Sequence, residues 1–239
     1  ILTFMTLLIK KLIRQTPLGE LYDHLKKIKW RIKCRKAVQE YIEHNSETKI
    51  QFGSGNNVIL GWFNTDYYPW RARRGKLYHL DVTSNFPIQS NRFSYAFSEH
   101  MIEHLTYKEG IFFLEEVLRI LRPEGVLRIS CPDLATLASL YDRPLSVDQE
   151  EYIREVVDRY QSDRKIYEPG HVINQLFGFQ HDFLYDETTL SKALCDVGFE
   201  QIVRATPGSS DHDPLNGIDA RSDDYTAFET LVMECKKPR

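Results

Sequence analysis

The chain has 239 residues, with 42% hydrophobic and 27% charged residues and a formal net charge of −3. These values are those of an ordinary globular protein, and the length suits one α/β domain with additions. The four cysteines are scattered, without a C-x-x-C pair. This spacing excludes a dense disulfide framework, argues against a structural zinc site and favours a reducing, cytoplasmic location.

Positive charge is concentrated at the start of the chain. Residues 1–36 carry a net charge of +8, so the remaining residues must carry −11. A basic arm on an acidic body suggests an anionic partner, such as a membrane surface or nucleic acid, and a solvated helix face is the alternative. The apolar run 1–13 is too short to cross a bilayer and lacks the charge order of a signal peptide.

A helical arm is predicted over residues 1–48. After Pro17, apolar residues step by three and four along one stripe, and most of the lysines lie off it: Leu18, Leu21, Leu25, Ile28 and Ile32. A second helical stretch is predicted over residues 36–44. Such a basic amphipathic arm can lie on a membrane surface, self-associate or pack on the domain that follows.

From residue 49 the pattern alternates between strands and helices, which predicts an α/β fold. Strands are predicted at residues 49–52, 62–65, 76–80, 94–97, 126–130, 201–205 and 229–234. Because only about nine residues separate the first two strands, we expect a loop or a very short helix around residues 56–61 instead of a full crossover helix.

Two helices have clear ends. The helix over residues 107–121 should stop before Pro123, and the helix over residues 187–197 should be capped by Asp186 and closed by Gly198. Between them lies an insertion at about residues 134–183, with an amphipathic helix near residues 149–162. An insertion after the carboxyl end of a strand belongs where such folds bind substrate.

Polar segments follow successive predicted strands. Gly53–Asn57 follows the first strand, Asp66 ends the second, Asp81 follows the third and Ser98-Glu99-His100 follows the fourth. The glycines allow a ligand to pass close to the backbone, and an acidic residue can accept hydrogen bonds from ribose hydroxyls. We therefore expect these segments to converge on one nucleotide-type site.

Five segments together resemble the class I S-adenosylmethionine-dependent methyltransferases, in particular the bacterial "methyltransferase type 11" group. They read GSGNNVILGWFNTD, LDV, FSEHMIEHL, FLEEVLRILRPEGVLRISCPDL and HDFLYDETTLSKALCDVGF. The resemblance covers about residues 49–237. It implies a Rossmann-like, doubly wound sheet, mostly parallel with an antiparallel last strand, and S-adenosylmethionine as the cofactor, released as S-adenosylhomocysteine.

The resemblance also implies cofactor-binding roles. Phe52, Gly53, Ser54 and Gly55 would line the methionine end of the cofactor. Asp66 would bind the ribose, Asp81 and Val82 would meet the adenine, and Ser98 and Glu99 would close the pocket near the sulfonium. The chain departs from the family pattern at Gln51, where an acidic residue is common, at Asn57 in place of a third glycine, and at Glu124 in a Pro-Gly-Gly turn.

Methyl transfer to a hydroxyl needs a proton acceptor, and histidine is suited to this near neutral pH. If a helix starts near His100, then His100, Glu103 and His104 share a face. We expect His100 or His104 to act as the base and Glu103 to orient it, with His171 and His181 as rival bases. A purely structural role for these side chains is the alternative.

Two further hypotheses remain open. His100-Met101-Ile102-Glu103-His104 also matches H-x-x-E-H, a zinc-hydrolase signature in which both histidines bind the metal. The chain could also be a non-catalytic module that keeps the cofactor pocket. We favour a methyltransferase without a metal that methylates an oxygen of a small molecule or glycan. Nucleic acid is disfavoured as the acceptor because the body is acidic.

Overall fold

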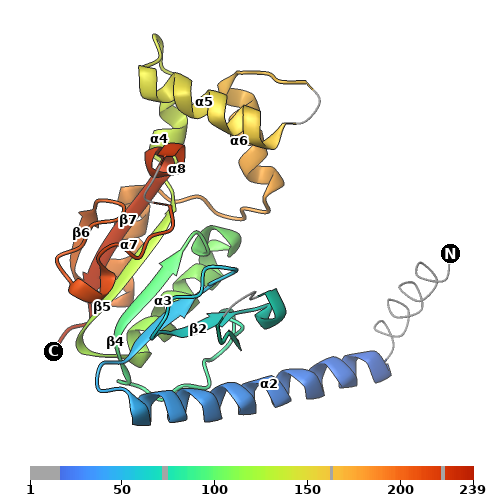
Figure 1. Cartoon of the computed structure of the whole chain (residues 1–239), viewed down its shortest axis with the longest axis vertical. Helices are drawn as coiled ribbons and strands as arrows, with labels where there is room; N and C mark the ends of the chain where they lie inside the picture. Colours follow the sequence, from blue (N-terminus) through green and yellow to red (C-terminus); the bar gives the residue numbers. More distant parts are fainter. Residues whose placement is uncertain (1–16, 72–74, 162–163, 222–223) are drawn as a thin grey trace.

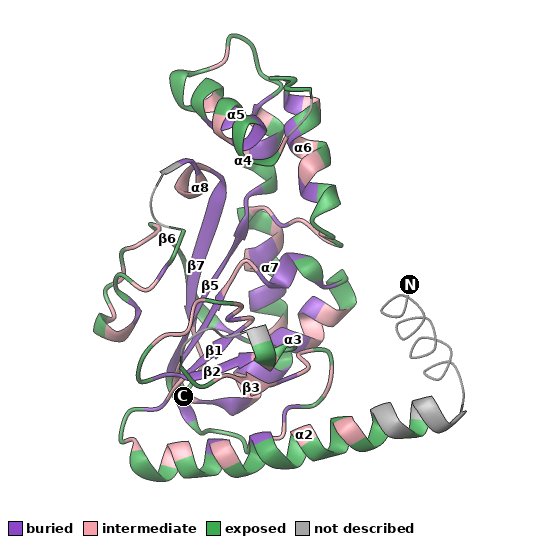
Figure 2. Ribbon diagram, turned by 45° about the vertical axis from the view of Figure 1, so that its right-hand side comes forward, coloured by how far each residue is buried: buried purple, intermediate pink, exposed green. Residues whose placement is uncertain are grey.

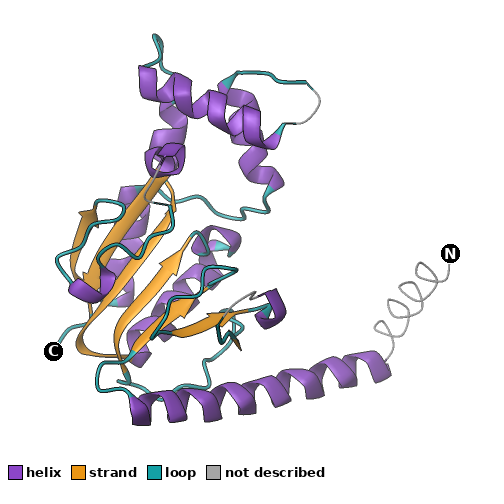
Figure 3. Ribbon diagram, in the orientation of Figure 1, coloured by secondary structure: helices purple, strands orange, loops and turns teal. Residues whose placement is uncertain are grey.

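The computed structural model describes residues 17–71, 75–161, 164–221 and 224–239; the apolar run 1–13 lies outside the described residues. One seven-stranded sheet has the order β3-β2-β1-β4-β5-β7-β6 (Figures 1 and 3). Its strands are β1 (Lys49–Phe52), β2 (Phe63–Asp66), β3 (Tyr78–His79), β4 (Phe93–Glu99), β5 (Leu121–Pro132), β6 (Glu200–Ala205) and β7 (Thr230–Lys236). The pairs from β3 to β5 are parallel, and β7 is antiparallel to both of its neighbours.

The helices lie in three places around this sheet. They are α2 (Pro17–His44), α3 (Tyr107–Ile120), α4 (Leu134–Ser139), α5 (Val147–Tyr160), α6 (Pro169–Gly178), α7 (Glu187–Val197) and α8 (Asp224–Glu229). Helices α3 and α7 cover the sheet, α2 runs along the end where β1 begins, and α4, α5, α6 and α8 lie beyond its opposite end (Figure 1). No described helix is long and apolar enough to span a membrane.

The sheet topology confirms the predicted fold class. Strand β1 and helix α7 have the predicted bounds; Asp186 caps α7, and Gly198 closes it with a left-handed φ of 109°. The first crossover is a loop, as the short spacing predicts. Asn64 holds this loop because its amide donates to the carbonyls of Ile59 and Trp62, and its Oδ1 accepts from the Ile59 N–H.

Most other predicted boundaries differ from the structure by a few residues, and two differences affect the architecture. In the described part of the arm, residues 17–44 form one continuous helix, α2, instead of two helical stretches. Pro123 does not sit in a free turn after α3, because β5 already begins at Leu121. Glu124 adopts a left-handed φ of 63°, and its N–H donates to the Lys237 carbonyl. The turn is therefore part of the start of strand β5.

The insertion has a hydrophobic core of its own. Helices α4, α5 and α6 bury side chains against one another and against α8, which comes from the far end of the chain (Figure 2). Tyr152, Val157 and Val172 are at most 1% exposed within it. This helical layer therefore stands as a packed unit over the carboxyl end of the parallel strands, where the predicted polar segments emerge.

Candidate active site

The loop after β1 makes a tight backbone cradle. Gly53 and Gly55 have left-handed φ values of 61° and 53°, which favour glycine. A Cβ on Gly53 would lie 2.4 Å from the Met101 side chain, whereas a Cβ on Gly55 would meet no atom within 4 Å. Ser54 holds the turn, because its N–H donates to the Thr65 carbonyl at 3.0 Å and its hydroxyl to the Asn57 carbonyl at 3.0 Å.

The carboxylates of Asp66, at the end of β2, and Asp81, after β3, can accept further hydrogen bonds. Asp66 accepts from the Gly55 N–H at 2.9 Å and from the Tyr68 N–H at 2.6 Å. Each carboxylate oxygen has two lone pairs, so this half-buried group can accept further hydrogen bonds. Asp81 accepts from the N–H and hydroxyl of Thr83 and lies beside Val82, on a 210 Å³ cavity between this loop and α2.

The end of β4 supplies the fourth side of the crevice. Ser98 is fully buried, and its hydroxyl has no hydrogen-bond partner within the part of the chain that the structure describes. Glu99 accepts from the Arg221 N–H at 3.0 Å, and burial raises the pKa of its carboxyl although this hydrogen bond opposes the shift. Phe52 packs between Phe86 and Phe113 in the core, so only its backbone can face a ligand.

These features fit S-adenosylmethionine. The open space above Gly55 is a cradle that a side chain would fill, the Asp66 carboxylate lies beside it, and the buried Ser98 hydroxyl is unpaired. A close backbone approach, a hydroxyl-binding carboxylate and unpaired polar groups are what a charged nucleoside needs. Gly53, Gly55, Asp66 and Ser98 would hold the group in this crevice.

A 310 Å³ cavity lies beside this crevice, between the end of β4 and the helical layer. Aromatic side chains, histidines and acids from both units line it: His100, Glu103, His104, Tyr152, Tyr160, Phe179, His181, Arg221, Tyr225 and Glu229. Burial raises the pKa of the Glu229 carboxyl, although Tyr152, whose hydroxyl donates to it, opposes the shift. The size and the mixed lining suit a small polar acceptor.

His100 is held by contacts on both ring nitrogens. Its backbone adopts a left-handed φ of 45°, an uncommon conformation for a residue with a side chain. Nε2 lies 3.0 Å from the Thr230 hydroxyl, which itself donates to the Thr226 carbonyl, so the ring donates from Nε2. Nδ1 lies 3.1 Å from the Arg221 guanidinium and 3.4 Å from Glu103 Oε1.

The expected helix at His100 is absent: residues 102–104 form a single 3-10 turn. His100 and Glu103 still meet, but His104 is exposed and its Nδ1 donates to the Gln180 carbonyl at 3.1 Å. Within the described residues, Glu103 and His104 converge with His181 instead of His100. The two-histidine arrangement of the zinc-hydrolase hypothesis is therefore not formed, and His171 lies exposed on α6, outside the cavity lining.

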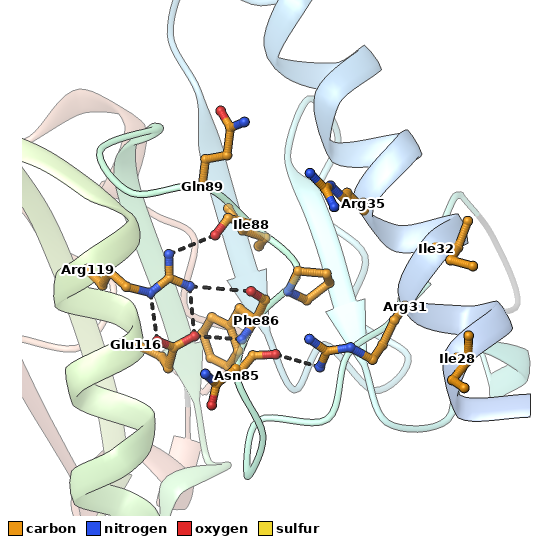
Figure 4. Close-up of a pocket in the computed structure, with 11 residues that line it drawn as sticks. Ile28, Arg31, Ile32, Arg35, Asn85, Phe86, Ile88, Gln89, Glu116 and Arg119 are labelled. Carbon is orange, nitrogen blue, oxygen red and sulfur yellow. Dashed lines mark hydrogen bonds and ion pairs between the residues drawn. The ribbon is translucent and has the colours of Figure 1, made fainter. Parts of the chain in front are cut away.

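A larger cavity of 580 Å³ lies away from this crevice, between α2, the loop over residues 85–89 and α3 (Figure 4). The Arg31 guanidinium donates to the Asn85 carbonyl at 2.6 Å, and Arg119 pairs with Glu116 on the other wall. Ile28 and Ile32 are 41% and 64% exposed at its rim. This cavity belongs to the basic arm and not to the converging strand ends.

Comparisons with known proteins agree with this geometry. The family described as "Methyltransferase domain" matches residues 67–129, from the end of β2 into β5. This match and the fold together support a class I S-adenosylmethionine-dependent methyltransferase. They likewise support S-adenosylmethionine as the cofactor, which the crevice fits.

Two solved structures are similar to this chain, and the first of them shows the same fold. An S-adenosylmethionine-dependent methyltransferase from Archaeoglobus fulgidus has a TM-score of 0.52 at 13% identity, over 90% of this chain and 100% of that one. A Thermotoga maritima protein described as a possible histamine N-methyltransferase has a TM-score of 0.49 at 15% identity, over 89% of this chain and 94% of that one. A search of curated proteins finds no match.

Several lining residues could not be found from the sequence. Tyr152 and Tyr160 lie on α5, whereas Arg221, Tyr225 and Glu229 come from the segment before β7. No local motif marks them, because they reach the cavity only through the packing of α8 against α5. His181 is the exception, since its place at the exit of the insertion already indicated a role.

Proposed function

We propose that this methyltransferase methylates a hydroxyl oxygen of a small molecule or glycan, with His100 as the proton acceptor. The observation that carries the proposal is the position of His100, on the wall of the 310 Å³ cavity and directly after Glu99 in the cofactor crevice. When bound, S-adenosylmethionine supplies the methyl group from its sulfonium and leaves as S-adenosylhomocysteine.

The contacts of His100 support this role. Its Nε2 proton is directed to Thr230, so the Nδ1 lone pair is available to an acceptor hydroxyl that displaces the exposed Arg221 guanidinium. The buried Glu103 carboxylate, 3.4 Å from Nδ1, would stabilise the imidazolium that forms, which is the orienting role expected for it. His104 directs its Nδ1 to a backbone carbonyl and is less enclosed.

The acceptor class follows from the cavity. A volume of 310 Å³ is at the lower end for ligand pockets and accommodates about one sugar-sized group. Tyrosine rings with polar tips, together with carboxylates, can bind a hydroxyl-rich molecule. Glu99, Glu103 and Glu229 give this region an acidic character, which opposes the binding of a phosphate backbone.

Methyl transfer to a panel of sugars and small alcohols tests the proposal. We expect His100→Gln to slow transfer by about 10²-fold or more, because a positioned base contributes about that much, while the affinity for S-adenosylhomocysteine stays unchanged. His171→Gln is the matched control, because His171 is exposed on α6. Full activity of His100→Gln, or transfer only to nitrogen or carbon acceptors, would contradict the proposal.

We also propose that the basic arm places the cytoplasmic enzyme at an anionic membrane surface. On α2, Leu21, Leu25 and Ile32 are 53%, 56% and 64% exposed along one stripe. Lysines and arginines flank the stripe, so an anionic, apolar surface complements it in both charge and hydrophobicity. The division into this arm, residues 1–48, and a methyltransferase domain, residues 49–239, is part of the same proposal.

Sedimentation with vesicles tests the arm. We expect the full chain to bind vesicles of anionic lipid and not neutral vesicles, and Leu25→Glu to weaken binding at least tenfold. Lys192→Glu, on the exposed side of α7, is the control for a general charge effect. If the protein instead forms concentration-dependent dimers that Leu25→Glu abolishes, and does not bind vesicles, the arm would serve self-association and the membrane proposal would be wrong.

A further inference from the structure

Three potential metal ligands meet at the edge of the acceptor cavity. Glu103, His104 and His181 each offer one ligand atom, and these atoms lie within 4.8 Å of one another. Glu103 and His104 come from the turn after β4, whereas His181 follows α6 at the exit of the insertion. The cluster therefore joins the methyltransferase sheet to the helical layer.

The carboxylate of this cluster lies 3.4 Å from His100 Nδ1 but accepts no hydrogen bond among the described residues. Glu103 itself is fully buried. Nδ1 of the neighbouring His181 is likewise buried without a partner. Burying a carboxylate without hydrogen bonds is unfavourable, and such groups are normally paired closely or bound to a cation. The convergence of this carboxylate with two imidazoles is therefore suited to binding a cation.

The backbone around the cluster fixes its geometry. The N–H groups of Asp182 and Phe183 both donate to the Glu103 carbonyl, at 2.8 Å and 3.2 Å. The His104 Nδ1 donates to the Gln180 carbonyl at 3.1 Å, which leaves Nε2 as the free nitrogen. Metal-binding histidines characteristically donate their second nitrogen in this way, because the bond fixes the tautomer and the ring orientation.

We propose that Glu103, His104 and His181 bind a divalent transition-metal ion of the zinc type. Two imidazoles and one carboxylate suit Zn²⁺ and Co²⁺ better than Mg²⁺ or Ca²⁺. Zinc bonds of about 2.0–2.2 Å place tetrahedral ligand atoms roughly 3.3 Å apart, so the three side chains need only close slightly around an ion. Three protein ligands leave one coordination position open toward the cavity.

This site would deepen the proposed function, on which its role rests. An acceptor hydroxyl at the open position would lose its proton more readily, because a bound cation lowers the pKa of an oxygen ligand. The proton would pass to His100, whose Nδ1 lies 3.4 Å from Glu103. The cation would thus hold the acceptor oxygen beside the base and near the cofactor crevice.

Metal binding tests the site without using activity. We would strip the full chain with a chelator and titrate it with Zn²⁺ by calorimetry and with Co²⁺ by visible absorption. We expect one ion per chain, no competition from millimolar Mg²⁺, and at least tenfold weaker binding for Glu103→Gln and His181→Gln. His171→Gln is the matched control, since His171 lies outside the cluster.

A second readout separates a metal ligand from a merely structural carboxylate. Without metal, Glu103→Gln should melt at or above the wild-type temperature, because it removes a buried charge that accepts no hydrogen bond, but it should lose the stabilisation by Zn²⁺. Absence of binding by folded wild type, or equal Zn²⁺ affinity of Glu103→Gln, would overturn the site. Intact Zn²⁺ binding without transfer to any hydroxyl acceptor would instead overturn the proposed function alone.

Discussion

Gly55 offers the most local test of the cofactor cradle. Gly55 and Gly61 both have left-handed φ values, 53° and 80°, and a Cβ on either would meet no atom within 4 Å. Alanine at either position should therefore cost about 1 kcal/mol of backbone strain. Only Gly55 lies beside Asp66, so we expect only Gly55→Ala to weaken S-adenosylhomocysteine binding in calorimetric titration. Equal affinity of the two variants would contradict the assignment of the cradle.

Glu229 should make the stability of the protein depend on pH. Burial raises the pKa of its carboxyl above the ordinary value of 4.5. At pH values between the ordinary pKa of the unfolded state and the raised pKa of the folded state, the folded state binds more protons. The free energy of unfolding therefore falls as pH rises through this range, by up to about 1.4 kcal/mol per pH unit. We expect Glu229→Gln to be more stable than wild type near pH 8 and similar to it below pH 4.5.

Chemical unfolding at several pH values checks this prediction. Asp196→Asn is a suitable control, because Asp196 is exposed and pairs with exposed Lys192 on α7. Its stability should follow that of wild type across the range. A constant difference between Glu229→Gln and wild type at every pH would show that the carboxyl is not destabilised by burial.

At the scale of elements, the sequence predicts a boundary correctly where nearby residues determine it. The capped helix α7 and the short strand β1 follow from Asp186, Gly198 and an apolar run, so their bounds were predicted correctly. The start of β5 at Leu121 was missed because the sheet, through the bond from Glu124 to Lys237, overrides the turn tendency of Pro123. Tertiary pairing of that kind has no local signature.

The same limit applies to the site. The glycine loop, Asp66 and the segment after β4 could be found because the carboxyl ends of parallel strands meet at one edge. Glu103 and His104 lie close to His181 because backbone hydrogen bonds join two segments that are nearly eighty residues apart in the sequence. Local spacing instead favoured a helix at His100, which the left-handed backbone of that residue prevents.

Strand β5 depends on one buried ion network. The fully buried Arg128 donates to both oxygens of Asp219 and to Glu234 on β7. Asp219→Ala would leave the guanidinium with one carboxylate and should cost about 3–5 kcal/mol. Asp196→Ala, which breaks an exposed pair on α7, should cost less than about 1 kcal/mol. Urea unfolding measures both, and equal losses would contradict the structural role of the network.

At the scale of the molecule, the cofactor cradle and the proposed metal cluster are neighbouring sites that are built from different residues. The cofactor cradle is built by the ends of β1 and β2, whereas the proposed metal cluster joins the turn after β4 to residue 181. Each ligand should therefore stabilise the fold through its own contacts. Ligands that bind only the folded state raise stability by RT ln(1 + [L]/Kd), or about 2.7 kcal/mol at a hundredfold excess over Kd.

Thermal melting with each ligand in turn tests this independence. We expect S-adenosylhomocysteine and Zn²⁺ each to raise the Tm of wild type by about 5–10 °C at a hundredfold excess over Kd. Asp66→Ala should lose most of the first shift, because it removes about 1.5–3 kcal/mol of hydrogen bonding to the cofactor, and should keep the second. Glu103→Gln should show the opposite pattern, since its carboxylate belongs to the metal cluster and makes no contact with the cradle of Gly55 and Asp66. If either variant lost both shifts, the two sites would be one cooperative unit, and the helical layer would have to move with the cofactor loops.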